Sequence, residues 1–150
     1  MRHSSSTKTT FRSNTAMKEG GALYVEEDGV FWGVDMLFFN NTANSGGALF
    51  VTEEAYVVLD GETNFTSNTA FSDGGAVGSP PRYDAYAFTV LGPRLDFNGS
   101  TYFVNNSAGE NGGGMALLGT LSVLFNTTNV VFYGNVANGA GGGVYLSSYA

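Results

Sequence analysis

Cysteine is absent from the 150-residue sequence, and histidine occurs once, at His3. Without cysteine the chain can form neither a disulfide framework nor a thiolate metal site. His3 lies in a polar, basic tail predicted for residues 1–10, so no Ser-His-Asp triad can be assembled on the rest of the chain. No run of 18 apolar residues occurs, which excludes a membrane-spanning helix, and MRHSSSTKTT lacks the apolar stretch of a signal peptide.

Positive charge is scarce after Lys18. Residues 1–18 contain four basic residues and no acid, whereas residues 19–150 contain all 13 acids and only Arg82 and Arg94. The second segment therefore carries a net charge of −11, from thirteen negative and two positive groups. Such a surface repels phosphate backbones, so we expect no nucleic-acid partner.

Glycine is abundant, with 22 residues, and ten of them belong to a repeated motif. The motif reads F-x-x-N-x-A, followed by two glycines, and it occurs five times. The copies begin at residues 11, 38, 65, 103 and 132, so the first two steps are equal and the third is the longest. The glycine pairs are Gly20 and Gly21, Gly46 and Gly47, Gly74 and Gly75, Gly112 and Gly113, and Gly141 and Gly142. Five copies in near-constant register indicate a repeat architecture over residues 11–150.

Each repeat contains three short apolar stretches separated by turn residues. One follows the glycines (LYV, LFV), one lies midway (VFWGV, AYVVL), and one contains the motif Phe (MLFF, TYFV). Three short strands in about 27 residues make one rung of a parallel β-helix, so the sequence predicts an all-β solenoid of about five rungs. Equivalent strands of successive rungs would pair about 4.8 Å apart, which stacks equivalent residues on each other.

This stacking explains which residues recur. The motif phenylalanines are predicted to form one internal column of stacked rings: Phe11, Phe38, Phe65, Phe103 and Phe132. The glycine pairs are predicted to occupy tight turns. The motif asparagines are predicted to hydrogen-bond from rung to rung: Asn14, Asn41, Asn68, Asn106 and Asn135. In the stretch after the glycines, strand alternation predicts that the first and third residues face inward and the second, such as Tyr24 or Phe50, outward.

The motifs resemble the repeats of the chlamydial polymorphic outer membrane proteins, whose signatures are F-x-x-N and G-G-A followed by Ile, Leu or Val. FRSN…GGAL, FNNTANSGGAL and FTSN…GGAV carry the resemblance, while copies four and five depart from it with G-G-G. The resemblance implies a right-handed, single-stranded parallel β-helix of the pectin-lyase-like type. It also implies an extracellular, cell-surface or outer-membrane location and no catalytic residues. We expect a piece of a longer exported protein, flanked by further rungs.

An enzyme is the alternative interpretation, because parallel β-helices also include polysaccharide lyases and hydrolases. Asp35 and Glu62 both lie three residues before a motif Phe, which places them one rung apart. That separation, about 5 Å, overlaps the spacing of the two carboxylates in retaining glycosidases. The competing interpretation is a pair of solvated carboxylates at strand starts.

A second acidic column gives a candidate calcium site. Glu26, Glu27 and Asp28 follow a strand in one rung, and Glu53 and Glu54 follow its counterpart in the next. Stacked like charges are destabilising, and Ca²⁺ prefers oxygen ligands. The competing interpretation is a charged turn that keeps the solenoid soluble, with no cofactor or metal bound.

The step from the third to the fourth copy, from Phe65 to Phe103, is longer than the first two steps, and the extra residues lie within 78–100. Two consecutive prolines cannot join an internal ladder, so this insertion is predicted to bulge from one face. It contains residue types enriched at binding hot spots, which makes these residues a candidate binding loop: Pro80, Pro81, Arg82, Tyr83, Tyr86 and Arg94. The competing interpretation is a loop without a partner.

Five N-x-S/T sequons occur, and two of them are the candidates for glycosylation in a secreting host. Asn64 immediately precedes its Phe and is predicted to point outward, and Asn98 lies in the insertion. Asn40 and Asn105 share the alternation of the buried Phe and are predicted to be less accessible.

Taken together, these features predict a non-enzymatic, surface-exposed structural or adhesion segment. Its expected partner is a protein or glycan on another cell surface or matrix. The alternative is a carbohydrate-active or carbohydrate-binding β-helix. A groove with several convergent carboxylates or bases would favour the enzyme, and an even lateral face would favour the scaffold.

Overall fold

The computed structural model describes residues 8–81, 92–119, 122–127 and 129–147. Every regular element in these ranges is a β-strand, and every strand pair is parallel. Each strand pairs with its counterpart one turn along, so the chain forms a solenoid of about four turns. The predicted all-β parallel solenoid is therefore confirmed. No helix of the described residues is long and apolar enough to cross a membrane.

The strands fall into four sheets. The Phe sheet contains β1 (Thr9–Arg12), β4 (Met36–Phe39), β8 (Thr63–Thr66), β12 (Thr101–Val104) and β16 (Val130–Tyr133). The Gly sheet follows the glycine pairs and contains β2 (Leu23–Val25), β6 (Leu49–Val51), β10 (Val77–Gly78), β14 (Met115–Leu118) and β18 (Val144–Ser147). The Trp sheet contains β3 (Val30–Val34), β7 (Tyr56–Asp60), β11 (Arg94–Phe97) and β15 (Ser122–Phe125).

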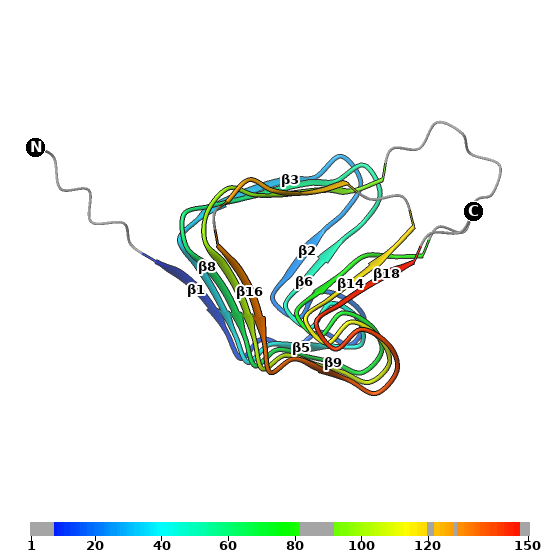
Figure 1. The fold of residues 1–150 in the computed structure, drawn as a ribbon. Helices are drawn as coiled ribbons and strands as arrows, with labels where there is room; N and C mark the ends of the chain where they lie inside the picture. The colour runs from blue at the N-terminus through cyan, green and yellow to red at the C-terminus, as the bar shows by residue number, and fades with distance from the viewer. Residues whose placement is uncertain (1–7, 82–91, 120–121, 128, 148–150) are drawn as a thin grey trace, which may run out of the picture.

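The fourth sheet, here called the Thr sheet, is made of two-residue strands. They are β5 (Thr42–Ala43), β9 (Thr69–Ala70), β13 (Ser107–Ala108) and β17 (Val136–Ala137). The sequence predicted three strands per rung, and the structure adds a fourth, short strand. It is formed by the alanine of the motif and the residue before it. Figure 1 looks along the stack: the Trp sheet runs across the top, the Phe sheet down the left, the Thr sheet along the bottom, and the Gly sheet returns on the right.

The core of the solenoid is lined by one column of motif phenylalanines. Their rings stack with centroids 4.5–5.1 Å apart and nearly parallel planes, from Phe11 to Phe132. Phe38, Phe65 and Phe103 are fully buried, whereas the rings at the two ends of the column are partly exposed. The column packs against aliphatic residues of the Gly and Trp sheets, among them Leu49, Val57, Val77, Leu95 and Met115.

A column of buried asparagines runs beside the rings. The Nδ2 group of Asn41 donates to Oδ1 of Asn68 at 3.0 Å and to the Phe11 carbonyl at 3.1 Å. Its Oδ1 accepts from both the backbone N–H and the Nδ2 of Asn14. The same pattern continues through Asn106 to Asn135. Each interior amide therefore satisfies both donors and its acceptor inside the protein, which offsets the cost of its burial.

The two glycines of a pair serve different purposes. The first glycine has positive φ in every copy, for example +60° at Gly46. The second allows neighbouring turns to approach, because a Cβ on Gly47 would overlap the Gly75 carbonyl oxygen. The first glycine is needed for its backbone conformation and the second for space.

The first and third residues of the Gly-sheet strands are buried in the inner turns as predicted, whereas Val144 and Leu146 of β18, the last strand of the sheet, are exposed. Leu49, Val51, Val77 and Met115 belong to the buried core. The outward residues Tyr24 and Phe50 stack on each other with centroids 6.0 Å apart. Phe50 is nonetheless buried, because its ring fills the space beside the glycines at positions 46 and 78.

The insertion lies between β10 and β11. Leu49 pairs with Val77 on one side of it, and Tyr56 pairs with Arg94 on the other. The segment from Val77 to Arg94 is therefore the counterpart of the much shorter segment from Leu49 to Tyr56. Arg82, Tyr83 and Tyr86 of the candidate loop lie outside the described residues. Pro80 and Pro81 are partly exposed at the start of the insertion.

Candidate functional site

The most distinctive surface of the solenoid is the outer face of the Trp sheet. Strand alternation brings one set of side chains to this face, which we call the outer Trp-sheet face: Val30, Trp32, Val34, Tyr56, Val58, Asp60, Arg94, Asp96, Asn98 and Leu124. The opposite residues of the same strands, such as Val57 and Leu95, enter the core. The indole of Trp32 is 70% exposed, and its neighbours Val30 and Val34 are also exposed. An apolar, aromatic strand thus faces solvent beside a polar cluster.

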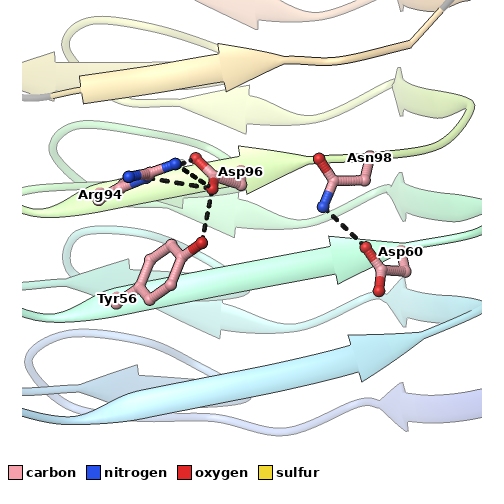
Figure 2. Close-up of polar contacts among 5 residues, drawn as sticks. All are labelled: Tyr56, Asp60, Arg94, Asp96 and Asn98. Carbon is pink, nitrogen blue, oxygen red and sulfur yellow. Dashed lines mark hydrogen bonds and ion pairs between the residues drawn. The ribbon is translucent and has the colours of Figure 1, made fainter.

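Tyr56, Arg94 and Asp96 form the first part of that cluster (Figure 2). The Arg94 guanidinium donates to both Asp96 oxygens, with an Nη2–Oδ2 distance of 2.8 Å. The Tyr56 hydroxyl donates to the same Oδ2 at 2.7 Å, and the guanidinium carbon lies 5.1 Å from the centre of the Tyr56 ring. One carboxylate therefore holds side chains of two successive turns together.

The same contacts set the pKa values of the cluster. The hydrogen bond from Arg94 lowers the pKa of Asp96, against the opposing effect of burial, and the hydrogen bond from Tyr56 lowers it further. Donation to Asp96 raises the pKa of Tyr56, and partial burial adds to the increase. At neutral pH the cluster consequently contains an ionised carboxylate and a neutral phenol.

Asp60 forms the second part of the cluster. Its Oδ2 accepts from the Trp32 indole Nε1 at 2.7 Å, and its Oδ1 accepts from Asn98 Nδ2 at 2.9 Å. These three residues come from successive turns, on or directly after β3, β7 and β11. Figure 2 shows Asp60 and Asn98 facing each other across neighbouring strands. The exposed indole is therefore anchored by a carboxylate that is itself held in place.

The state of Asp96 differs from that of a general acid. A general acid needs a carboxyl group whose pKa is raised towards neutrality, whereas Asp96 is ionised and engaged by two donors. Trp32 and Tyr56, by contrast, belong to residue types that are enriched at binding surfaces.

Arg94 requires a correction to the expectation from the sequence. The sequence places it in a protruding binding loop, but it is the first residue of β11 and pairs with Asp96 on the outer Trp-sheet face. The sequence did not reveal this strand, because RLDF is not a continuous apolar run. Its position in the Trp sheet follows from its pairing with β7 and β15.

The acidic candidates for calcium are not gathered into a site. Among the described residues, no group of three or more His, Cys, Asp or Glu side chains could hold a metal ion, so Glu27, Asp28, Glu53 and Glu54 do not form the candidate calcium site. They lie at turns, where Glu53 is half-buried and the other three are exposed, and Asp28 and Glu54 adopt positive φ of 59° and 60°. Glu26, Glu27 and Glu53 line a groove together with Tyr24, Thr52 and the two prolines of the insertion.

Asp35 and Glu62, the carboxylate pair weighed for a glycosidase, do lie one turn apart, but each is engaged. Asp35 Oδ1 accepts from the Glu62 backbone N–H at 2.9 Å. Glu62 accepts from Asn64 and forms an ion pair with Lys8, and both contacts lower the pKa of its carboxyl group. A retaining glycosidase needs one of the two as a protonated acid, and the contacts of Glu62 favour its ionised form.

The sequons differ from their predicted exposure. Asn98 is exposed and Asn64 half-buried, and both donate to neighbouring carboxylates. Asn40 and Asn105 were expected to be less accessible, and this was wrong, because both are exposed. Their φ angles of 54° and 53° lie in the left-handed region, so strand alternation does not extend to them.

Sequence reasoning did not find Trp32, Tyr56, Asp60 or Asp96. The available signal was the alternation within VFWGV, which puts the single tryptophan on the face opposite Phe31. The contact to Asp60 also required the register between β3 and β7, in which Val34 pairs with Asp60.

The repeats of this chain are similar to a repeat of known proteins. Residues 8–26, 35–52 and 129–147 match the model of the Chlamydia polymorphic membrane protein repeat. The chain carries this repeat at three places. The matched segments contain β1 with β2, β4 with β6, and β16 with β18, so each joins a Phe-sheet strand to the Gly-sheet strand that follows it. No curated protein and no solved structure matches the chain.

Proposed function

We propose that this chain is a non-catalytic segment of a cell-surface protein that makes adhesive contacts through the outer Trp-sheet face. The polymorphic membrane protein repeat and the solenoid fold fit a surface structural segment of a larger protein. The repeat family is associated with the chlamydial outer membrane or surface, which supports display outside the cell. The expected partner is a protein or glycan on an opposing cell or matrix.

One observation carries the adhesive part of the proposal. Val30, Trp32 and Val34 project from β3 into solvent, next to the paired polar residues of β7 and β11. Large exposed apolar side chains in a contiguous group are a feature of interaction sites, and tryptophan is among the residues that contribute most to binding. β3 is the edge strand of the Trp sheet, and its pairing with β7 over five residues fixes its backbone, which lowers the entropy lost on contact.

The non-catalytic part is supported by the state of the carboxylates. Asp60, Asp96 and Glu62 are each held by two donors from neighbouring side chains. The contacts of Asp96 and Glu62 lower the pKa of each carboxyl group, which suits a structural role better than that of an acid catalyst.

A bead assay tests the adhesive role. Beads coated with the purified 150-residue chain are passed over several cultured cell types and over immobilised extracellular matrix, and retained beads are counted. We expect retention above that of bare beads, and its loss with a Val30→Ser, Trp32→Ser, Val34→Ser triple variant. Equal retention of the two proteins would contradict the proposed face. Incubation with neutral and acidic polysaccharides should release no reducing or unsaturated ends, and such release would contradict the non-catalytic role.

A further inference from the structure

We propose that the outer Trp-sheet face binds a neutral hexopyranose, with the sugar ring stacked on the indole of Trp32 and its hydroxyls bound by Asp60 and Asn98. This inference rests on the proposed function, because it names the class of ligand that the adhesive face would recognise.

Trp32 provides the stacking surface. Its indole is the largest aromatic group of the chain and is 70% exposed. The Nε1–Oδ2 bond of 2.7 Å to Asp60 fixes the direction in which the ring lies. The C–H face of a pyranose is apolar, so it gains contact with an exposed aromatic ring while its hydroxyls point sideways. Because the indole is already anchored, little side-chain freedom is lost when a ring settles on it.

Asp60 and Asn98 provide hydrogen bonds beside that surface. A carboxylate has about four lone-pair sites, and at Asp60 each oxygen accepts one bond, from Trp32 or from Asn98. Each oxygen can therefore accept a further bond from a sugar hydroxyl. The exposed amide of Asn98 has, besides the N–H that it gives to Asp60, a second N–H and an oxygen. Vicinal hydroxyls, which both donate and accept, match such a carboxylate–amide pair.

The dimensions of the site limit the size of the ligand. Trp32, Asp60 and Asn98 lie on or directly after three successive strands of one sheet. Two strand spacings amount to about 10 Å. A mono- or disaccharide unit, free or at the end of a longer glycan, can touch all three residues.

The negative charge of the outer Trp-sheet face limits which sugars it can bind. The face contains the carboxylates of Asp60 and Asp96 against the single guanidinium of Arg94, which is engaged by Asp96. Residues 19–150 as a whole have a net charge of −11. Uronic acids, sulfated sugars and sialic acid would be repelled, so the ligand is a neutral sugar.

The chain contains one tryptophan, so its fluorescence reports on Trp32 alone. The purified chain is titrated with neutral di- and trisaccharides of glucose, galactose, mannose and N-acetylglucosamine, with a heparin disaccharide as the anionic probe. Emission and acrylamide quenching are followed. We expect saturable protection of Trp32 by at least one neutral probe and none by heparin. If no neutral probe protects the indole, or if heparin protects it better, the proposal is overturned.

Variants then test the contacts, with binding of the active probe measured by calorimetry. Trp32→Ala should abolish binding, and Asp60→Asn should weaken it about tenfold, as expected for a lost hydrogen bond to a charged group. Tyr133→Ala is the matched control, since this tyrosine is 68% exposed on the Phe sheet and should not affect binding. Unfolding midpoints establish that each variant is folded. Unchanged binding in Trp32→Ala overturns the sugar site.

The bead assay separates the two proposals. If no sugar binds but the Val30→Ser, Trp32→Ser, Val34→Ser variant still loses bead retention, the adhesive face remains and its ligand is a protein, which overturns the sugar site alone. If the triple variant is retained as well as the original chain, the adhesive face is overturned too.

Discussion

The side-chain amide of Asn68 donates to Oδ1 of Asn106 at 3.0 Å across 38 residues of sequence, and Asn41 makes the same contact to Asn68 across 27. The ladder is therefore insensitive to the length of the intervening chain. It depends only on the return of each turn to the same register. The predictions below test what maintains that register.

Asn68→Ala should reduce the free energy of unfolding by about 3 kcal/mol, because buried groups that lose a partner each cost about 1–3 kcal/mol. The change leaves the Phe38 carbonyl and the Asn41 donors without the Asn68 side chain. Denaturant unfolding measures the loss. Asn44→Ala is the control, since Asn44 is exposed, and it should cost less than about 0.5 kcal/mol. Equal losses in the two variants would show that the ladder contributes little.

Phe65→Ala should cost about 3–5 kcal/mol, as for other buried phenylalanines. The ring is fully buried between Phe38 and Phe103, at centroid distances of 4.7 and 4.9 Å. Phe71→Ala, at a side chain that is 69% exposed, should have little effect. A thermal or denaturant midpoint for Phe65→Ala within error of the original would contradict the structural importance of the column.

Gly47→Ala should prevent stable folding or cost more than about 3 kcal/mol, the upper range of overpacking effects. Its Cβ would overlap the carbonyl oxygen of Gly75, and the Gly47 N–H donates to the Gly74 carbonyl, so the two backbones are held together. Gly143→Ala is the matched control, because its nearest neighbours would lie at 3.6 Å or more. Soluble yield and circular dichroism compare the two. A well-folded Gly47→Ala protein would mean that the turns can separate.

Stability should fall in acid through Asp96. Its pKa is lower in the folded protein than in the unfolded chain, first because of the hydrogen bond from Arg94. The contribution is therefore present above the unfolded pKa, about 3.9, and is lost as the pH falls through the folded pKa. Asp96→Asn should be less stable than the original at pH 7, and the difference should shrink below about pH 4. Urea midpoints across this range measure it, and a difference that stays constant would contradict the assignment.

The sequence was sufficient to predict the architecture because equivalent residues contact each other. Every repeat had to place Phe and Asn where its neighbours place theirs, so the register of the motifs is the register of the sheets. The Thr sheet was missed because a two-residue strand leaves no alternation pattern. It is recognised only by backbone pairing, such as Thr42 with Thr69.

The candidate site was harder to predict, because it depends on contacts between residues that are not at equivalent positions of successive turns. Trp32 reaches Asp60, which stands two positions further along its own strand than the residue paired with the tryptophan. Arg94 was assigned to a loop because the insertion before it obscures its register. The exposure of Asn40 was misjudged for a different reason: a single left-handed residue ends the alternation.

The insertion between β10 and β11 has a practical consequence. Additional chain enters there, yet β10 still pairs with β6 and β14, and β11 with β7 and β15. The corner between the Gly and Trp sheets is thus a position where foreign sequence can be carried without loss of the stack. An epitope or affinity tag placed in the equivalent corner between β6 and β7 would mark a chosen turn and leave the outer Trp-sheet face unmodified.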